Sequence, residues 1–567
     1  MLTEEQQAVV DVSRQLLPRE MLKVDACAGS GKTSTLVEIA KANPHARFLY
    51  LAFNRAIVSE AKQRFPANVK IYTTHGLAYY WYAYVYGNER LHDIKPGYKI
   101  FDIEPLFPRL GNRELNGLLL EYRDFLYSSL EEPYDQNVAK IFEAVQQGKL
   151  PLTHDFYLKL YQLRCQPKFR NYDYVLLDEA QDTNAVTMAI FTDNDCRRIL
   201  VGDSHQAIYG FRGAINGLNG VQAEHNLNLT HSFRSLQPIL DRANWFLNRY
   251  DAHNSIPMTS QAEPSAQCHY EAIITRTNAE IIRTIRDLNP QEMGDYFLLR
   301  PAEAVFSCAL SILAVFYGVG NVYPAYSWLK RFTSKEKLEK YIEDCGDIEI
   351  KQNLKLVNDF GPELLNIFSK AQALAANRDA THCITTAHTA KGLEWDRVTL
   401  ANDFPDLPDC FEKTKQVTKG EAVMSKQSFE QELNLYYVAV TRAKYELEDD
   451  TANGAYYDKV LSNTLKRQQM LQAQSQSYFE HHTSFTATTV DDDDYEADYA
   501  EPAESTPPIR VIPGKAQQSR AVATATPKMP QGNAVMFQLL KTESADSLPD
   551  SAVVMKRKRG RPRKHPK

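Results

Sequence analysis

Short apolar runs rich in β-branched and aromatic residues alternate with longer segments of helical periodicity up to about residue 450. The runs that predict strands are Leu22–Asp25, Phe48–Ala52, Val69–Tyr72, Tyr174–Leu177, Ile199–Val201, Ala272–Thr275, Cys383–Thr386 and Val398–Leu400. This alternation predicts an α/β fold in which parallel sheets are flanked by helices. Such sheets bind ligands at the carboxyl ends of their strands, so we expect functional residues in the loops that follow these runs.

Two segments interrupt the alternation and predict mostly helical insertions, one over residues 79–169 and one over residues 296–378. Beyond residue 450 the chain is polar, with a Thr-rich stretch at 483–489 and an acidic, Pro-containing stretch at 501–508. A segment of that composition has too little apolar surface to offset the entropy of folding. We therefore expect a disordered tail over residues 451–555, followed by a basic terminus over residues 556–567.

The composition is that of an ordinary soluble protein, with 43% hydrophobic and 24% charged residues in 567. No run approaches the ~20 apolar residues of a membrane span, and the N-terminus has no signal-peptide pattern, so no membrane partner is expected. The eight cysteines are scattered without a C-x-x-C pair, which favours a reducing compartment. The net charge is −6, but Asp491–Asp494 is acidic and Lys556–Lys567 is basic, so the net charge does not exclude a nucleic-acid partner.

The stretch DACAGSGKT follows the first predicted strand and opens a helix. It has the G-x-x-x-x-G-K-[ST] pattern of a phosphate-binding loop, except that Ala26 replaces the first Gly. Gly29 and Gly31 allow the backbone to approach phosphate oxygens, and backbone N–H groups at the helix N-terminus can bind them. Lys32 would reach the β- and γ-phosphates, and Thr33 would ligate Mg²⁺. The alternative is an ordinary glycine-rich turn.

The stretch YVLLDEAQD is an apolar strand that ends in two adjacent carboxylates, Asp178 and Glu179. Asp178 would hold Mg²⁺ together with Thr33, and Glu179 would activate the attacking water. A solvated acidic turn is the alternative, but it does not explain so compact an acidic cluster at the end of so apolar a run. The two motifs together predict a site that hydrolyses ATP with Mg²⁺.

These motifs and several others resemble, in the same order, those of superfamily 1 helicases of the UvrD/Rep type. The others are T-x-H-x-L-A from Thr73, VGDSHQAIYGFRGA from Val201, TTAHTAKGLEWD from Thr385 and ELNLYYVAVTRAK from Glu432. The stretches LYLAFNRAIVSEAKQRFP, LTHDFYLKLYQL and LTHSFRS resemble the F-box DNA helicase branch in particular. No F-box is expected, because the chain begins directly at the Gln motif.

The resemblance implies two RecA-like P-loop motor domains, each with a mostly helical insertion, and ATP bound between them. The first motor domain would comprise residues 1–78 and 170–226, and the second residues 227–295 and 379–450. The catalytic residues would be Lys32, Asp178, Glu179, Gln206, Arg234 and Arg442. Gln206 would sense the γ-phosphate, and the two arginines would reach it from the second motor domain. Arg442 could instead be a surface charge on a helix.

The nucleotide-binding residues implied by the resemblance are Gln6, Ala28, Gly29, Ser30, Gly31, Lys32, Thr33, Ser34, Phe233 and Glu394. Gln6 would read the adenine edge, with Gln7 as an alternative, or Gln6 could simply be a polar residue that opens a helix. Phe233 would stack on adenine where the family usually has Tyr. Ser34 stands where UvrD itself has an Arg near the base, and Glu394 would lie near the ribose and the DNA interface.

The DNA-binding residues implied by the resemblance are Thr74, His75, Tyr209, Phe211, Arg212 and His388. Aromatic rings stack on unpaired bases without reading their sequence, and Phe211 replaces the family's common Trp. A structural role is the alternative for Thr74 and for the two histidines. The Tyr-rich stretch Tyr79–Tyr86 could be another stacking surface, although a core helix is the favoured interpretation.

The basic terminus contains Arg559-Gly560-Arg561-Pro562, which resembles an AT-hook. Its arginines would enter the narrow minor groove of A·T-rich duplex DNA while Gly560 lets the backbone approach the groove floor. The alternatives are a nuclear import signal and a basic tail that contacts phosphates anywhere.

By resemblance, the protein would be an ATP-dependent DNA helicase or translocase on single-stranded DNA and 3′-tailed duplexes. It would move 3′→5′ in DNA repair, recombination or replication, either in a nucleoid-associated cytoplasmic location or, in a eukaryote, in the nucleus. The alternatives are a translocase that strips proteins from single strands with little unwinding, and an ATP-gated DNA-binding scaffold. A fused nuclease is disfavoured, since the tail lacks a folded pattern, and no protein partner is predicted.

Overall fold

The computed structural model describes residues 2–52, 54–165, 168–210, 213–250, 257–265, 268–418 and 421–483. The chain divides into two compact units, Met1–Tyr457 and Asp458–Lys567. Two large sheets and their helices lie in the first unit. Among the described residues, no helix is both long enough and apolar enough to cross a membrane.

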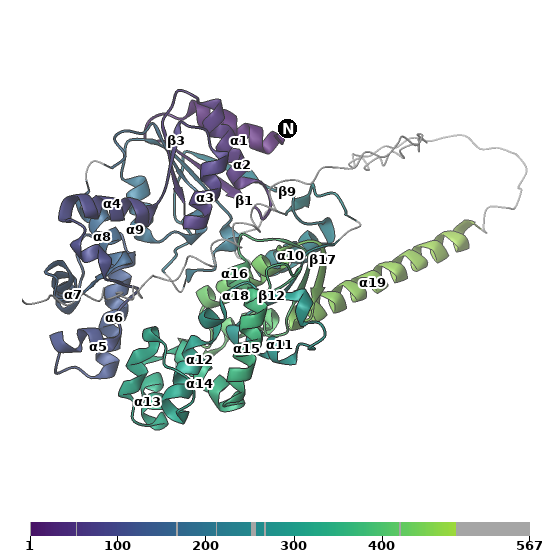
Figure 1. Cartoon of the computed structure of the whole chain (residues 1–567). Helices are drawn as coiled ribbons and strands as arrows, with labels where there is room; N and C mark the ends of the chain where they lie inside the picture. Colours follow the sequence, from purple (N-terminus) through teal and green to yellow (C-terminus); the bar gives the residue numbers. More distant parts are fainter. Residues whose placement is uncertain are drawn as a thin grey trace, which may run out of the picture. The chain divides into compact units, whose positions relative to one another are not determined.

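Six parallel strands form the first sheet, in the order β3-β2-β6-β7-β1-β8. The strands are β1 (Met21–Ala26), β2 (Phe48–Ala52), β3 (Val69–Thr73), β6 (Tyr174–Leu177), β7 (Arg197–Gly202) and β8 (His225–Leu229). The accompanying helices are α1 (Glu4–Gln15), α2 (Lys32–Ala42), α3 (Arg55–Arg64) and α9 (Ala185–Thr192). Figure 1 shows β1 and β3 of this sheet with the helices α1, α2 and α3 around them. Every residue of the interior strands β2 and β6 is buried, which explains their continuous apolar sequences, because helices cover both faces of a parallel sheet.

Five parallel strands form the second sheet, in the order β12-β13-β11-β14-β17. The strands are β11 (Glu271–Thr275), β12 (Tyr296–Leu298), β13 (His382–Thr386), β14 (Trp395–Leu400) and β17 (Ala443–Asp449). The accompanying helices are α10 (Gln237–Tyr250), α11 (Asn278–Asp287), α16 (Ala387–Ala390), α17 (Leu407–Lys415) and α18 (Lys426–Val440). Two small strand pairs join β9 (His231–Ser232) to β10 (Thr259–Ser260) and β15 (Val417–Thr418) to β16 (Glu421–Ala422). The prediction of parallel sheets flanked by helices is confirmed, and each predicted strand lies within an observed one.

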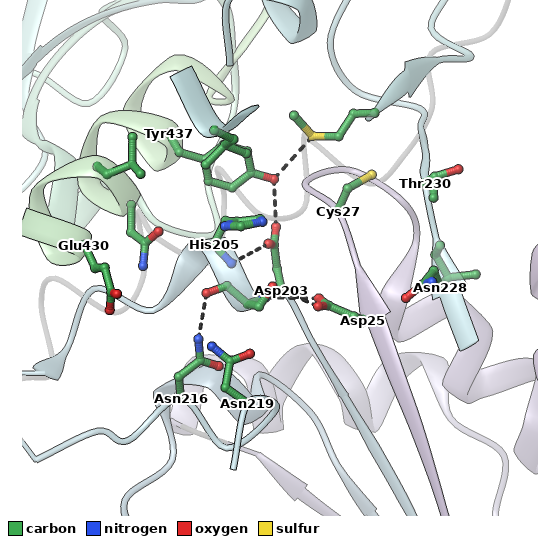
Figure 2. A pocket seen from close by; sticks show the side chains of 16 residues that line it. Asp25, Cys27, Asp203, His205, Asn216, Asn219, Asn228, Thr230, Glu430 and Tyr437 are labelled. Carbon is green, nitrogen blue, oxygen red and sulfur yellow. Dashed lines mark hydrogen bonds between the residues drawn. The ribbon is translucent and has the colours of Figure 1, made fainter. Parts of the chain in front are cut away.

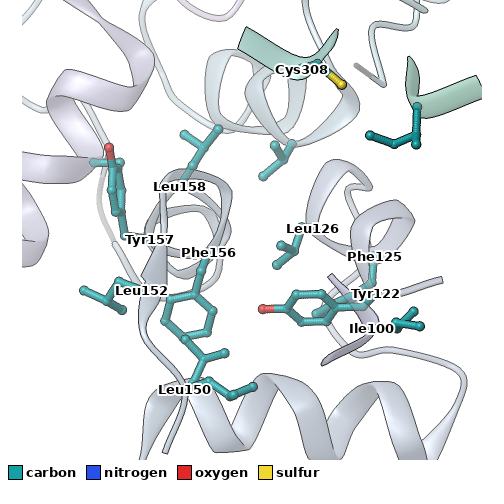
Figure 3. Packing of buried hydrophobic residues seen from close by; sticks show 14 of the residues in the cluster. Ile100, Tyr122, Phe125, Leu126, Leu150, Leu152, Phe156, Tyr157, Leu158 and Cys308 are labelled. Atoms are coloured by element: carbon teal, nitrogen blue, oxygen red, sulfur yellow. The ribbon is translucent and has the colours of Figure 1, made fainter. Parts of the chain in front are cut away.

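The two interrupting segments are mostly helical, as predicted. The first contains α4 (Thr74–Tyr86), α5 (Ile100–Ile103), α6 (Asn112–Tyr127), α7 (Gln136–Gln146), α8 (His154–Arg164) and the short strands β4 (Ile94–Lys95) and β5 (Leu152–Thr153). The second contains α12 (Ala302–Tyr317), α13 (Lys335–Cys345), α14 (Ile348–Phe360) and α15 (Glu363–Ala376). Figure 3 shows part of the buried cluster, to which the first segment contributes Phe125 and Phe156 and the second contributes Cys308. The Phe142 ring lies against Phe125 and Phe156 with centroids 5.4 and 4.8 Å away.

Helix α4 confirms the core-helix interpretation of the Tyr-rich stretch Tyr79–Tyr86 in part, whereas the stacking surface stays a prediction. Tyr82 is buried in the core, whereas Tyr84 is 90% exposed and Tyr80 is 64% exposed. The helix therefore supplies both a core face and a face of exposed rings.

Three expected boundaries need correction. The boundary at 226/227 cuts β8, which pairs with β1, so the first sheet extends to Leu229. The polar sequence HNLNL concealed this edge strand, since polar residues alternate along its exposed side. Residue 296 opens β12, which belongs to the second sheet and is too short for a clear pattern.

The third correction concerns the expected disorder from residue 451. The chain instead forms α19 (Ala452–Thr483). Its first turn is anchored in the first unit, because the Trp245 ring packs against Tyr456 and Tyr457 at 5.8 and 5.6 Å. Residues 484–567 lie outside the described part of the chain.

Candidate functional site

The phosphate loop connects β1 to α2 and is shaped by two glycines. Gly29 and Gly31 have φ of +77° and +80°, a left-handed conformation that favours glycine. A Cβ on Gly29 would lie 2.5 Å from the Cβ of Arg234, so this glycine also permits close approach of the segment after β9. The loop is therefore built against residues that lead into the second sheet.

One polar atom of this loop points to an anionic ligand. The Ser30 hydroxyl is buried and has no hydrogen-bond partner among the described residues. A buried polar group without a partner is costly, and bound phosphate would satisfy it. Helix α2 starts at Lys32, so its free N–H groups face the same place, and ATP fits this loop.

The carboxylates after β6 lie directly beside the start of α2. The Thr33 hydroxyl donates to Asp178 Oδ2 at 3.0 Å, and the Tyr50 hydroxyl donates to the same oxygen at 2.7 Å. Burial and the adjacent Glu179 together raise the pKa of Asp178 to about 6, against the lowering effects of Tyr50 and Lys32. A divalent cation between Thr33 and Asp178 would relieve this cost, so the two predicted metal ligands fit Mg²⁺.

Glu179 has a strained backbone and a charged side chain. Its φ of +52° places a non-glycine residue in the left-handed region. Burial opposes its ionisation, but Lys32 and Lys391 outweigh burial, and the pKa of Glu179 is lowered. Burial likewise opposes the charge on Lys32, yet Glu179, Asp203 and Asp178 raise its pKa. The site thus holds a lysine cation next to a carboxylate that is ready to accept a proton.

The second wall of the site comes from the part of the chain that carries the second sheet. The Phe233 N–H donates to the Gly29 carbonyl at 2.9 Å, which fixes the segment containing Arg234 against the phosphate loop. Arg234 Nε donates to Glu394 Oε2 at 2.7 Å. These residues surround a pocket of about 430 Å³, whose lining comprises Gly29, Gly31, Phe233, Arg234, Ala262, Glu263, Glu394, Lys444 and Tyr445.

Arg442 is not a surface charge on a helix, because its side chain is 1% exposed. Its Nε donates to the Val438 carbonyl at 2.9 Å and its Nη1 to the Leu393 carbonyl at 3.0 Å. Burial and the neighbouring Arg234 together lower its pKa to about 9. Arg442 is therefore held by backbone carbonyls of α18 and of the loop before β14, close enough to Glu179 and Arg234 to interact electrostatically.

Gln6 opens helix α1, as one of its two interpretations holds, whereas its role at the adenine edge stays a prediction. Its backbone N–H and side-chain oxygen form a capping box with Thr3 at the start of α1, while Nε2 donates to the Ser30 carbonyl at 3.1 Å. Gln7 instead points to Asp11 on the exposed side of α1. Ser34 is exposed, and its hydroxyl accepts from Arg64 Nη2 at 2.7 Å, so a guanidinium from α3 occupies the surroundings of this position. Sequence reasoning missed Arg64, because it lies 30 residues further along the chain.

Gln206 and two predicted DNA-binding residues form a second cluster. Gln206 is buried and donates from Nε2 to Asp203 at 2.7 Å. The Tyr209 hydroxyl donates to the His388 carbonyl at 3.3 Å, and Lys391 Nζ lies 5.2 Å from the Tyr209 ring centroid. The loop after β7 therefore meets α16 of the second sheet.

Thr74 and His75 open α4, where Thr74 is buried. His75 Nε2 lies 3.5 Å from Asp155 of α8, and its ring lies edge-on to Tyr157. Phe211 and Arg212 lie outside the described residues, as do Arg559, Gly560, Arg561 and Pro562.

Several residues of the site escaped sequence analysis. Lys391 forms a buried ion pair with Asp182 and also donates to the Gln206 carbonyl at 2.6 Å. Tyr437 of α18 extends its hydroxyl to Asp203 of the first sheet at 3.0 Å (Figure 2). Asp203 and Asp182 lay within stretches already singled out, where a short apolar run followed by Asp was the available signal. Lys391 and Tyr437 also lay in quoted motifs, but nothing local indicated contacts with residues about 200 positions away.

Comparison with known proteins identifies two domains. Residues 164–225 match the UvrD/REP helicase N-terminal domain, and residues 325–448 match the UvrD-like helicase C-terminal domain. F-box DNA helicase protein 1 of Schizosaccharomyces pombe is 30% identical over 79% of this chain and 57% of its own length. F-box DNA helicase 1 of Gallus gallus is 28% identical over 78% of this chain and 48% of its own length. DNA helicase II of Escherichia coli is 24% identical over 40% of this chain and 38% of its own length.

The chain spans about half the length of the two F-box DNA helicases that it matches. The domain matches and these relatives agree with the order of motifs along the chain. The chain is thus similar to UvrD-like helicases in both of these domains and in the order of its motifs.

Proposed function

We propose that this protein is an ATP-dependent DNA helicase or translocase that moves along single-stranded DNA. The observation that carries the proposal is the contact of Thr33 with Asp178 beside Lys32 and Glu179, opposite arginines from the second sheet. Such an arrangement suits phosphoryl transfer, in which catalysis consists mainly of positioning and charge stabilisation.

Each side chain has a defined task in this proposal. The phosphate loop and Lys32 bind the phosphates, while Glu179 accepts a proton from the attacking water. Mg²⁺ held by Thr33 and Asp178 would neutralise charge on the β- and γ-phosphate oxygens. Arg234 and Arg442 would stabilise charge on the γ-phosphate, for which Arg442 must exchange backbone carbonyls for phosphate oxygens.

DNA would bind near the cluster of Tyr209, His388 and Lys391. Tyr209 lies three residues after Gln206, so a base stacked on that ring would act on the residue that senses the γ-phosphate. Phe211 and Arg212 would extend this surface, and Thr74 and His75 would contact the DNA backbone. The relatives' names as DNA helicases support DNA as the substrate. Movement 3′→5′, a role in repair or recombination, and a nuclear or nucleoid location also belong to the proposal and rest on the resemblance of the motifs.

The test is steady-state ATP hydrolysis with and without oligo-dT, in the wild type and in Lys32→Ala. We expect strong stimulation by single-stranded DNA in the wild type and no hydrolysis in Lys32→Ala. Equal turnover with single-stranded DNA, duplex DNA and no DNA would favour the ATP-gated scaffold instead. Stimulated turnover without strand separation would favour a translocase that strips proteins from DNA.

A further inference from the structure

Tyr437 makes a pair of hydrogen bonds that links the two parts of the nucleotide site. Its hydroxyl accepts from the Ala28 N–H of the phosphate loop at 3.1 Å and donates to Asp203 Oδ2 at 3.0 Å. Tyr437 lies on α18, whereas Ala28 and Asp203 follow β1 and β7 of the first sheet. The Tyr437 hydroxyl on α18 thus joins the loops that follow β1 and β7 of the first sheet.

The path continues to the residue expected to sense the γ-phosphate. Asp203 Oδ2 also accepts a hydrogen bond from Gln206 Nε2 at 2.7 Å. The same carboxylate oxygen therefore accepts from both Gln206 and Tyr437. The resulting chain runs from the Ala28 N–H through the Tyr437 hydroxyl and Asp203 to Gln206. We call these four residues the tyrosine relay.

The surroundings of the relay favour directional bonds. Tyr437 and Asp203 are 2% and 1% exposed, so water does not compete for them. Burial and the negative charge of Asp203 raise the pKa of Tyr437, and the hydroxyl keeps its proton. Met258 Sδ lies 3.4 Å from the hydroxyl but is a weak acceptor, which leaves the carboxylate as the preferred partner.

We propose that Tyr437 is a positioning residue that couples the phosphate loop to Gln206 and thereby to the DNA-binding cluster. The two hydrogen bonds of its hydroxyl require one relative placement of α18 and the first sheet, because a shift of α18 must break both together. Arg442 follows α18 two residues after its end, so the same shift moves this arginine relative to the phosphates. The inference rests on the proposed function, since it concerns regulation of the same ATP site.

The adjacent residue provides a matched control. Tyr436 is equally buried on α18 and donates its hydroxyl to a carboxylate, Asp449, but Asp449 belongs to β17 of the second sheet. Tyr436→Phe therefore removes a comparable hydrogen bond without touching the link between the two sheets.

The test measures kcat and KM for ATP at saturating oligo-dT in the wild type, Tyr437→Phe and Tyr436→Phe, with thermal unfolding as a check on folding. We expect kcat to fall by about tenfold in Tyr437→Phe, since one such bond to a charged group is lost, while KM changes by less than about twofold. Tyr436→Phe should keep the wild-type kcat. A kcat in Tyr437→Phe equal to that of Tyr436→Phe would overturn the proposal.

Asp203→Asn supplies a second variant. It weakens the acceptor shared by Tyr437 and Gln206, so kcat should also fall, and the double variant with Tyr437→Phe should be no slower than the slower single variant. Losses that multiply in the double variant would contradict a relay. A normal kcat in Asp203→Asn would contradict it even if Tyr437→Phe fails to fold. If wild-type turnover does not respond to oligo-dT, the proposed function fails, whereas the same comparison in DNA-free turnover still tests the relay.

Discussion

Lys391 and Asp182 form a buried ion pair in which Nζ lies 2.6 Å from Oδ2. Asp182 follows β6 of the first sheet, and Lys391 lies between α16 and β14 of the second. Lys391 also donates to the Gln206 carbonyl and lowers the pKa of Glu179. One cation thus interacts with Asp182, with Glu179 and with the Gln206 carbonyl, and the last two residues have proposed roles at the γ-phosphate.

Removal of this cation should be costly. Breaking a buried ion pair from one side leaves an uncompensated charge, so Lys391→Met should lower the free energy of unfolding by ~3–5 kcal/mol. Asp182→Asn combined with Lys391→Met should recover part of that loss, because the double variant buries no lone charge. Denaturant unfolding of the wild type, both single variants and the double variant measures the coupling. If the losses of unfolding free energy in the two single variants simply add in the double variant, the interaction between Lys391 and Asp182 contributes nothing to stability.

The Tyr209 ring should matter more for movement than for DNA-free hydrolysis. Stacking of an aromatic side chain on an unpaired base is worth ~1–3 kcal/mol, so Tyr209→Ala should weaken oligo-dT binding by about 5- to 150-fold. Translocation should slow correspondingly, as followed by the arrival of the protein at a labelled strand end. Tyr134→Ala is the matched control, because Tyr134 is a 90% exposed tyrosine away from this cluster. Equal losses in both variants would remove Tyr209 from the DNA path.

Lys159 should give the first insertion a pH-dependent stability. Its ammonium group is buried and donates to the backbone carbonyls of Ser128 and Leu130, and burial lowers its pKa from 10.5 to about 8. Between these two values the unfolded chain binds more protons than the folded one, so the folded state gains stability as the pH rises.

The measurement is the difference in unfolding free energy between the wild type and Lys159→Met as a function of pH. We expect this difference to be constant below pH 8. Between pH 8 and 10.5 the unfolding free energy of the wild type should rise relative to that of Lys159→Met. A difference that stays constant over this whole range would show that the folded state does not perturb Lys159.

The basic terminus should affect duplex binding alone. Deletion of residues 556–567 should leave ATP hydrolysis stimulated by oligo-dT unchanged, since the helicase motifs end near residue 447. Affinity for A·T-rich duplex should fall more than affinity for G·C-rich duplex at matched salt, as minor-groove insertion favours A·T tracts. Equal losses on the two duplexes would reduce the terminus to a general phosphate-binding tail.

Local patterns in the sequence predicted most of the fold. Interior strands such as β2 and β6 are apolar throughout, and the glycines of the phosphate loop stand where the backbone needs them. The edge strand β8 was not predicted, because HNLNL is largely polar. Helix α19 was not predicted, because a polar helix has a composition similar to that of a disordered tail. Patterns of this kind depend on burial, and both elements bury little along much of their length.

The candidate site was predictable where its residues belong to compact motifs. Thr33 and Asp178 were expected to meet, and the structure places them in direct contact. The partners of Asp203 and Asp182 were not predictable, because Tyr437 and Lys391 reach them across a distance set by how the two sheets pack. Such contacts depend on tertiary arrangement, which leaves no periodic signal in the sequence.

Strand displacement on a labelled 3′-tailed duplex is the most direct test of the proposal that this ATP site drives movement on DNA. The wild type should separate the strands with ATP and Mg²⁺, and a 5′-tailed duplex of the same sequence should remain paired. Glu179→Gln should bind ATP and the tailed duplex but separate nothing, because it cannot activate the attacking water. Strand separation by Glu179→Gln at the wild-type rate would contradict the account.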